Sequence, residues 1–413
     1  AADITLYDAE GRLIGIEKNT KNAEFEVEKP VFWNAEKPYL YKVRAERNGE
    51  IISINTAFRT IEIDSEYALR INGVRVKLHG VNHHDTHPSN GWCMTNGELR
   101  RDLELMKKLN INCIRTSHYP PAPAFLEMCD EIGFYVVLET DIETHGIGQR
   151  RVGVGYDSDN PVWPCSNPDW KKEFIERMQR TALRDRNHPS IIMWSLGNES
   201  GFGDNHKAMS DWVRQQRDGR LIHCEDASRK SVDYNHPELT EYTDVFSWMY
   251  PLHSAVKAYA EDKEKKQPYF MCEYAHSMGN SPGSVWEYSE LVDKFPKLIG
   301  GCIWEWADHT VVVDGVQKYG GDFKGELTHD GNFCCGGMVF SDRSFRAGSL
   351  EIKAAYQPMK TVYENGLLTV FNRYDFTDLS ECEFSYFVKC DGVKVKSESL
   401  RLKVPPHGNT SLK

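Results

Sequence analysis

Eight short apolar runs alternate with helix-like segments between residues 64 and 355, and this alternation limits the possible folds more than any other feature of the sequence. Two of the intervening segments, GELRRDLELMKKLN (97–110) and PDWKKEFIERMQRTALRDRN (168–187), have the 3.6-residue periodicity of amphipathic helices. The apolar runs are VKLHGVN (76–82), NCIRTSH (112–118), GFYVVLETD (133–141), SIIMWSLGN (190–198), RLIHCE (220–225), DVFSWM (244–249), YFMCEY (269–274) and GGCIWEW (300–306). Eight such βα units predict an α/β fold, a (β/α)8 TIM barrel, which usually takes about 250 residues.

The segments on either side of this region have the two-residue period of β-strands. Residues 1–63 contain two hairpin turns, Asp-Ala-Glu-Gly at 8–11 and Asn48-Gly49, and strand-like sequence returns after residue 356. A complete immunoglobulin-like sandwich needs roughly 100 residues, more than either flank provides. We therefore predict a partial immunoglobulin-like β-sandwich over 1–63, the barrel over 64–355 and the start of a second immunoglobulin-like β-sandwich over 356–413. On this prediction the chain is the middle of a longer polypeptide.

The composition excludes several classes of partner. A net charge of -11 leaves no basic field for nucleic acid, and no apolar run approaches the roughly 18 to 20 residues of a membrane span. Eleven cysteines occur without a CxxC pair, and Cys113, Cys272 and Cys302 lie inside apolar runs, where a free cysteine behaves as a small hydrophobic residue. The cysteines predict a reducing, cytoplasmic location without a disulfide framework.

Two acids immediately follow strand-like sequence: Glu199 follows MWSLGN of the fourth run, and Glu273 follows YFMC of the seventh. The chemistry of (β/α)8 barrels takes place at the C-terminal ends of the strands, and these two strands lie on opposite sides of the barrel mouth. Glycosidic hydrolysis needs such a pair, with one carboxyl as general acid/base and one as nucleophile, about 5 to 5.5 Å apart in retaining enzymes. The alternative for either acid alone is a buried salt bridge with Arg115 or another base.

Other polar residues at the strand ends are candidate metal ligands. Glu143 and His145 are two residues apart, so in an extended segment their side chains point the same way and could hold Mg²⁺. A hydrogen-bonded pair without metal is the alternative. The run HHDTH also leaves open a zinc site, built from His83, His84 and His87 with His145.

Four aromatic residues near the same strand ends offer flat faces on which a sugar ring could stack. They are Trp248, Tyr250, Trp304 and Trp306. Each could equally be a large core residue. Together with the paired acids they favour a carbohydrate ligand.

Several longer segments resemble those of one known family. NCIRTSHYPPAPAFLEMCDEIGFYVV (112–137) and DRNHPSIIMWSLGNE (185–199) resemble the two signature segments of glycoside hydrolase family 2, and CEYAHSMGN (272–280) resembles the nucleophile segment of its β-galactosidases. The segments GVNHHDTHP (80–88), DIETHG (141–146), GGCIWEWAD (300–308) and FCCGGMVFSDR (333–343) follow in the family's order. The resemblance extends over essentially the whole chain.

The resemblance implies roles for individual residues. Glu273 corresponds to the nucleophile that forms a covalent galactosyl-enzyme, and Glu199 to the general acid/base. Asn198 would contact the sugar 2-OH. The other residues that would bind substrate or stabilise the transition state are Tyr250, His84, His118, His276 and Trp304.

The resemblance also implies metal ions. Glu143, His145 and Glu199 match the family's Mg²⁺ ligands, which agrees with the spacing argument for Mg²⁺. A Na⁺ ion is expected too, but Gly336 stands at an expected ligand position and offers no side chain.

The implied activity is that of a retaining β-galactosidase that releases terminal non-reducing β-D-galactose from galactosides such as lactose. Family members are commonly oligomeric, so the resemblance also leaves open that the protein forms a homo-oligomer. The family's N-terminal domain, which supplies an acid that recognises galactose, is not in this chain. Three alternatives remain: a related β-glucuronidase, a zinc-dependent barrel hydrolase, and a non-catalytic carbohydrate-binding fragment.

Overall fold

The computed structural model describes residues 1–148, 158–233, 235–329 and 331–412. The chain divides into two compact units, Ala1–Ala355 and Tyr356–Lys413.

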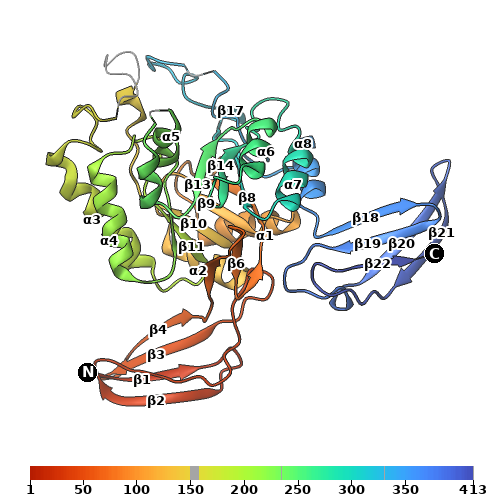
Figure 1. Ribbon diagram of the computed structural model, residues 1–413, viewed down its shortest axis with the longest axis horizontal. Helices are drawn as coiled ribbons and strands as arrows, with labels where there is room; N and C mark the ends of the chain where they lie inside the picture. Colours follow the sequence, from red (N-terminus) through yellow and green to blue (C-terminus); the bar gives the residue numbers. More distant parts are fainter. Residues whose placement is uncertain (149–157, 234, 330, 413) are drawn as a thin grey trace. The chain divides into compact units, whose positions relative to one another are not determined.

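An eight-stranded parallel sheet forms the centre of the larger unit (Figure 1). Its order, β12-β11-β10-β9-β8-β15-β14-β13, is that of a barrel whose consecutive strands are neighbours. The strands are β8 (Leu78–His83), β9 (Cys113–Thr116), β10 (Tyr135–Glu139), β11 (Ile191–Ser195), β12 (Leu221–His223), β13 (Phe246–Met249), β14 (Tyr269–Tyr274) and β15 (Leu298–Ile303). Six of them lie within the predicted apolar runs, β8 extends one residue beyond its run and β15 begins two residues before its run, so the predicted (β/α)8 barrel is confirmed.

Two local features bring the barrel strands together. Gly300 has a φ of 118°, and a Cβ there would lie 2.1 Å from the carbonyl oxygen of Leu78, so a side chain would separate β15 from β8. On the other side, β12 and β13 form no ladder with each other. Asp244 closes that gap, because its N–H donates to Ile222 O (2.9 Å) and its carboxylate accepts from Ile222 N (2.8 Å).

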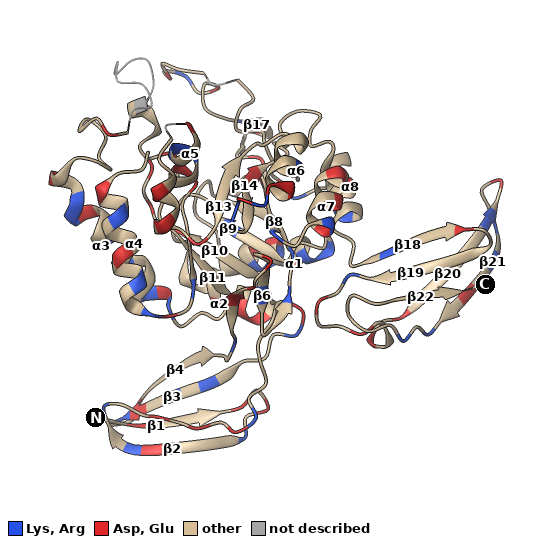
Figure 2. Cartoon of the chain, viewed as in Figure 1, with Lys and Arg blue, Asp and Glu red and all other residues tan. Residues whose placement is uncertain are grey.

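Helices surround the barrel, one after each strand (Figure 1). They are α1 (Asn96–Lys108), α2 (Pro123–Ile132), α3 (Lys171–Asp185), α4 (Asp204–Gln216), α5 (Glu225–Asp233), α6 (His253–Glu261), α7 (Val285–Lys294) and α8 (Ala347–Ala355). Helix α1 begins with a capping box formed by Thr95 and Glu98, and α2 begins at Pro123 and ends at Gly133 in the left-handed conformation. Acidic and basic residues are mixed along α3 and α4 (Figure 2).

Antiparallel strands precede the barrel in the same unit. The sheet order is β2-β1-β3-β4, and the predicted turn at Asn48-Gly49 joins β3 to β4 with both residues at positive φ. A smaller sheet, β5-β6-β7, leads into the barrel. The strands are β1 (Ala2–Tyr7), β2 (Leu13–Thr20), β3 (Tyr41–Arg47), β4 (Glu50–Thr56), β5 (Ile61–Ile63), β6 (Leu69–Ile71) and β7 (Val74–Arg75).

The second unit is also built of antiparallel strands, as predicted for residues after 356. Its sheets are β18-β19-β22 and β20-β21, around a small core of Val370, Leu379, Leu402 and Val404. The strands are β18 (Met359–Glu364), β19 (Leu367–Asn372), β20 (Phe384–Cys390), β21 (Val393–Leu400) and β22 (Asn409–Leu412).

Two observations bear on the environment of the protein. All eleven cysteines lie in the described ranges, and none of them is in a disulfide. Within those ranges, every helix is too short or too polar to cross a membrane.

Candidate active site

The guanidinium of Arg115, at the C-terminal end of β9, is the centre of a buried network in the barrel. It pairs with Glu139 through Nε–Oε2 (2.8 Å) and Nη2–Oε1 (3.1 Å), and Nη1 donates to Glu273 Oε1 (2.8 Å). Nη1 also donates to Asn82 Oδ1 (3.0 Å), and Nη2 to Asn198 Oδ1 (2.8 Å). One side chain therefore fixes residues at or near the ends of four other strands, β8, β10, β11 and β14.

The charges in this network stabilise one another. Burial alone would raise the pKa of Glu139, but Arg115 and His118 hold it well below its usual range. Burial opposes the charge on Arg115, yet Glu139 and Glu273 raise its pKa. Both groups are therefore ionised at neutral pH, which gives the barrel mouth a fixed, oriented charge.

Glu273, on β14, is 5% exposed, and both of its oxygens are engaged. Oε2 accepts from the Tyr250 hydroxyl at 2.7 Å, while Oε1 accepts from Arg115. Burial and the neighbouring Glu273 carboxylate raise the pKa of Tyr250, so the phenol remains protonated as a donor. The salt bridge to Arg115 considered from the sequence is present, and it holds the carboxylate in a single orientation with a second donor beside it.

A hydrogen-bonded chain continues below Arg115 into the barrel. Ser195 Oγ donates to Glu139 Oε2 (2.6 Å) and lies 2.8 Å from His223 Nδ1, and His223 Nε2 lies 2.9 Å from Ser247 Oγ. Burial and the positive charge of Arg115 lower the pKa of His223 to about 3, so the imidazole is neutral. The interior beneath the site is therefore polar, dry and fully hydrogen-bonded along this chain.

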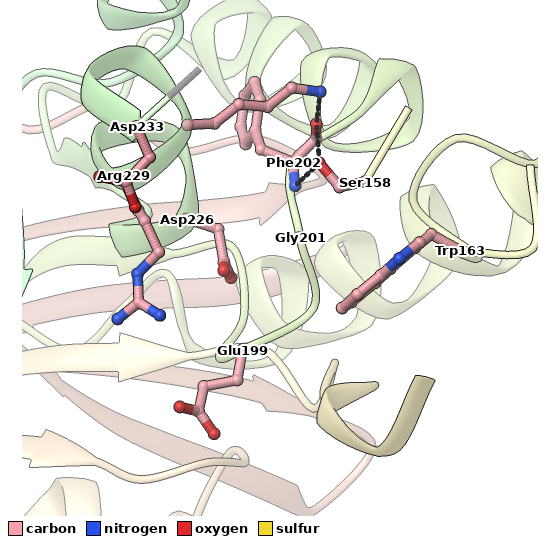
Figure 3. A pocket seen from close by; sticks show the side chains of 9 residues that line it. Ser158, Trp163, Glu199, Gly201, Phe202, Asp226, Arg229 and Asp233 are labelled. Carbon is pink, nitrogen blue, oxygen red and sulfur yellow. Dashed lines mark hydrogen bonds between the residues drawn. The ribbon is translucent and has the colours of Figure 1, made fainter. Parts of the chain in front are cut away.

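Glu199 lies in different surroundings, four residues after β11, with a positive φ of 39°. Its side chain is 30% exposed and contacts His145 Nδ1. It lines a pocket of about 190 Å³ together with Trp163, Asp226 and Arg229. Figure 3 shows the Glu199 carboxylate on one side of this pocket, with Trp163 and Arg229 beyond it. A carboxyl group in this position can exchange a proton with a bound molecule or with water.

Glu143, His145 and Glu199 come together as the sequence predicts. Their candidate ligand atoms all lie within 4.8 Å of one another. The segment of Glu143 is held against that of Glu199, since Glu143 forms a β-bridge with Asn198 and Asn198 N donates to Ile142 O (2.9 Å). Two carboxylates and one imidazole, partly open to water, fit a divalent ion that keeps several water ligands.

The remaining predicted substrate-binding residues gather around Trp304. The His118 ring stacks on it with centroids 5.3 Å apart, and the rings of His84 and His276 lie 5.6 and 6.4 Å away. Asn198 Nδ2 lies 3.4 Å from His118 Nε2. Burial lowers the pKa of His276. These residues form an aromatic wall beside Glu273.

Two other predicted aromatic residues do not join this wall. Trp306 is 1% exposed and belongs to the core. Trp248 stacks on Phe246 with ring centroids 6.1 Å apart. For Trp306 the alternative stated from the sequence, a large core residue, is therefore the one observed.

The four histidines of the zinc alternative point to different partners. His83 stacks on Phe125, His87 Nε2 lies 3.1 Å from Glu98, and His145 Nδ1 contacts the Glu199 carboxylate. They form no common ligand set. At the proposed sodium position, a Cβ on Gly336 would face His276 Cε1 at 3.1 Å and Glu305 Oε1 at 3.4 Å.

Sequence reasoning missed several residues of this region. Glu139 lies inside the apolar run GFYVVLETD and was interpreted as part of the strand. An acid within an apolar run was the signal that could have identified it, since the side chain is fully buried. Tyr119, whose hydroxyl accepts from Asp85 N at 2.9 Å, and the pair Glu305 and His309 carry no spacing pattern of their own.

Three family models match the chain in consecutive segments. "Glycosyl hydrolases family 2" matches residues 3–58, "Glycosyl hydrolases family 2, TIM barrel domain" matches residues 61–361, and "Beta-galactosidase, domain 4" matches residues 368–413.

Curated proteins with similar sequences are named beta-galactosidases. The Arthrobacter sp. (strain B7) protein is 40% identical over 383 residues, which is 89% of this chain and 37% of that protein. The Actinobacillus pleuropneumoniae protein is 37% identical over 94% of this chain and 40% of its own length. The chain thus spans about two fifths of the length of these relatives.

Solved structures with a similar fold include two bacterial beta-glucuronidases. The Faecalibacterium prausnitzii structure has a TM-score of 0.65 at 21% identity, covering 86% of this chain and 61% of its own. A Ruminococcus gnavus structure has a TM-score of 0.66 at 21% identity, covering 86% and 64%. At this identity the likeness concerns the fold alone.

Proposed function

This chain belongs to family 2 of the glycosyl hydrolases, and we propose that it carries the catalytic barrel of a retaining β-galactosidase. The observation that supports this most strongly is that a rigidly held carboxylate, Glu273, and a partly exposed one, Glu199, both lie at the C-terminal ends of barrel strands, β14 and β11. The beta-galactosidase names of relatives at 33–40% identity support galactose as the sugar.

In the proposed first step, Glu273 attacks the anomeric carbon while Glu199 donates a proton to the glycosidic oxygen, and the aglycone leaves as an alcohol. In the second step Glu199, now a carboxylate, takes a proton from water. The resulting oxygen nucleophile displaces Glu273, and galactose leaves with its original anomeric configuration.

Other residues would prepare these steps. Arg115 occupies Asn198 Oδ1 and so orients the Asn198 amide nitrogen, which lies 3.4 Å from His118 Nε2 and would donate to the sugar 2-OH. Tyr250 would donate to Glu273 until the carboxylate attacks. Trp304, with His84, His118 and His276 around it, would contact the galactose ring and its hydroxyl groups.

Glu143, His145 and Glu199 would hold a Mg²⁺ ion, as their donor atoms are suited to one. The ion would supply positive charge that fixes the orientation of Glu199. We also assign the protein to the cytoplasm, because its eleven cysteines are free.

The proposal is tested with a 2,4-dinitrophenyl β-galactoside, with the matching β-glucuronide as control substrate. The full-length protein should hydrolyse the galactoside and leave the glucuronide almost untouched. Glu273→Gln should abolish turnover. In a Glu273→Gly variant, added azide should restore release of dinitrophenol and give the α-galactosyl azide, because azide then attacks from the face of the missing carboxylate.

Each outcome bears on one part of the proposal. If Glu273→Gln kept the activity of the wild type, Glu273 would not be the nucleophile. Formation of β-galactosyl azide would place the nucleophile elsewhere, and preference for the glucuronide would overturn the sugar assignment. The same assay on this chain alone measures how much the rest of the protein contributes.

A further inference from the structure

We propose that His84, Glu305 and His309 form a metal site that takes a divalent transition-metal ion of the Zn²⁺ class, separate from Glu143, His145 and Glu199. The three residues each offer one ligand atom, and these atoms all lie within 4.8 Å of one another.

One oxygen of the Glu305 carboxylate, Oε2, lacks a hydrogen-bond donor among the described residues. The Glu305 side chain is 3% exposed, and Oε2 lies 2.7 Å from His309 Nε2. Neither of these two atoms has a hydrogen-bond partner among the described residues. Over the same ranges Glu305 forms no ion pair with a lysine or an arginine. A buried carboxylate without a cation costs several kcal/mol, so a bound metal ion would supply what the site lacks.

The backbone already holds the three residues in place. Strands β8 and β15 pair in parallel, and just beyond them Trp306 N donates to Asn82 O (2.9 Å). Met338 N donates to Glu305 O (2.7 Å), and His309 N to Cys334 O (2.9 Å). Each ligand is therefore attached to, or within two residues of, a hydrogen-bonded backbone position, which reduces the entropy lost on metal binding.

The surroundings of His84 suit a metal-bound imidazole. The Tyr119 hydroxyl lies 3.4 Å from His84 Nδ1 and can orient the ring. Trp92 lies edge-on to both His84 and His309, with ring centroids 6.5 and 6.3 Å away.

The donor set indicates the class of metal. Two imidazoles and one carboxylate are the ligands of a known type of open tetrahedral zinc site, whereas Mg²⁺ prefers oxygen ligands. Tetrahedral zinc ligands lie about 3.3 Å apart. Separations of up to 4.8 Å would therefore need to close by at most about 1.5 Å, and Glu305 Oε2 and His309 Nε2, now 2.7 Å apart, would move slightly apart. The fourth position would be taken by water.

The test uses the full-length protein, stripped with chelator and held in excess Mg²⁺ so that Zn²⁺ does not fill the Glu143 cluster. Calorimetric titration with Zn²⁺ should give one site per chain. Co²⁺ in place of Zn²⁺ should give the intense visible absorption of a tetrahedral complex. His309→Gln and Glu305→Gln should weaken Zn²⁺ binding by more than about 100-fold, beyond the effect of losing a supporting contact.

The matched control is His236→Gln, because His236 is an exposed histidine that also lies beside a carboxylate, at 2.9 Å from Glu238. It should bind Zn²⁺ as the wild type does. The proposal is overturned if the wild type shows no tetrahedral Co²⁺ spectrum. This measurement uses the wild type alone and does not depend on the folding of any variant. The proposal is also overturned if Zn²⁺ binding survives in His309→Gln, or is lost in His145→Gln instead. Zinc binding does not depend on galactosidase activity, so failure of either proposal leaves the other standing.

Discussion

The two carboxylates at the barrel mouth lie in contrasting surroundings. Glu273 is buried and receives hydrogen bonds on both oxygens, whereas Glu199 is partly exposed and lines a pocket. An attacking carboxylate must be ionised and fixed, while a general acid/base must exchange its proton with an aglycone and then with water. The difference in burial therefore matches the proposed division of roles between two residues of the same type.

The largest effect is expected from removing the group that makes the Glu273 side rigid. Arg115→Met would leave Glu139 and Glu273 buried without their common cation. We expect the free energy of unfolding to fall by about 3–5 kcal/mol and turnover to fall by about 10³-fold or more. Urea unfolding and steady-state hydrolysis of an aryl galactoside measure the two effects.

The control for this substitution is Arg177→Met. Arg177 pairs with Asp141, also near the end of β10, but it is half exposed. Its loss should change the free energy of unfolding by less than about 1 kcal/mol. If both variants lost the same unfolding free energy, the difference in burial between the two sides of the site would not affect stability.

On the open side, Glu199→Gln should produce an effect that depends on the leaving group. Lactose needs a proton on its departing oxygen, so kcat/KM should fall by about 10²-fold to 10³-fold. Dinitrophenol leaves without a proton, so kcat/KM for its galactoside should stay within about tenfold of the wild type.

Glu143→Gln separates proton transfer from metal binding, because it alters the same cluster without removing the acid. It should affect both substrates alike. Equal losses on both substrates in Glu199→Gln would argue against its role as the acid.

A smaller effect is expected for Tyr250→Phe, which removes one of the two donors to Glu273. We expect kcat to fall by about 10²-fold while the protein stays folded, since Tyr250 is 44% exposed. Tyr259→Phe is the matched control, because its hydroxyl donates to Gln267 O on the outside of the barrel. If Tyr259→Phe lost as much activity as Tyr250→Phe, the hydrogen bond from Tyr250 to Glu273 would have no special role in catalysis.

The contrast between the two sides also explains what the sequence could predict. Strand ends follow from the period of apolar residues, so Glu199 and Glu273 could be placed at one barrel mouth without coordinates. The spacing of Glu143 and His145 similarly predicted that they act together, and the structure brings both to Glu199.

Contacts between distant segments could not be predicted in this way. The contacts of Arg115 with four residues depend on side-chain directions from several strands, and Glu139 looked like part of an apolar strand. The histidines of HHDTH diverge: His83, the last residue of β8, stacks on Phe125, whereas His84 lies against Trp304 and His309. His84 finds its partners more than 200 residues away, in Glu305 and His309.

The smallest expected effect tests how far the dry environment extends below Arg115. His223 is buried with its pKa lowered to about 3, whereas in the unfolded chain it titrates near 6.5. The unfolded state therefore binds the extra proton between these two values, and folding stability falls as the pH falls below about 6.5. In His223→Gln this loss is absent, so the drop in unfolding free energy between pH 7 and pH 5 should be about 2 kcal/mol smaller than in the wild type. Urea unfolding at the two pH values measures it, with the exposed His236→Gln as the variant that should keep the wild-type drop. An unchanged drop in His223→Gln would mean that water reaches the imidazole, and the buried side of the site would then end at Glu139.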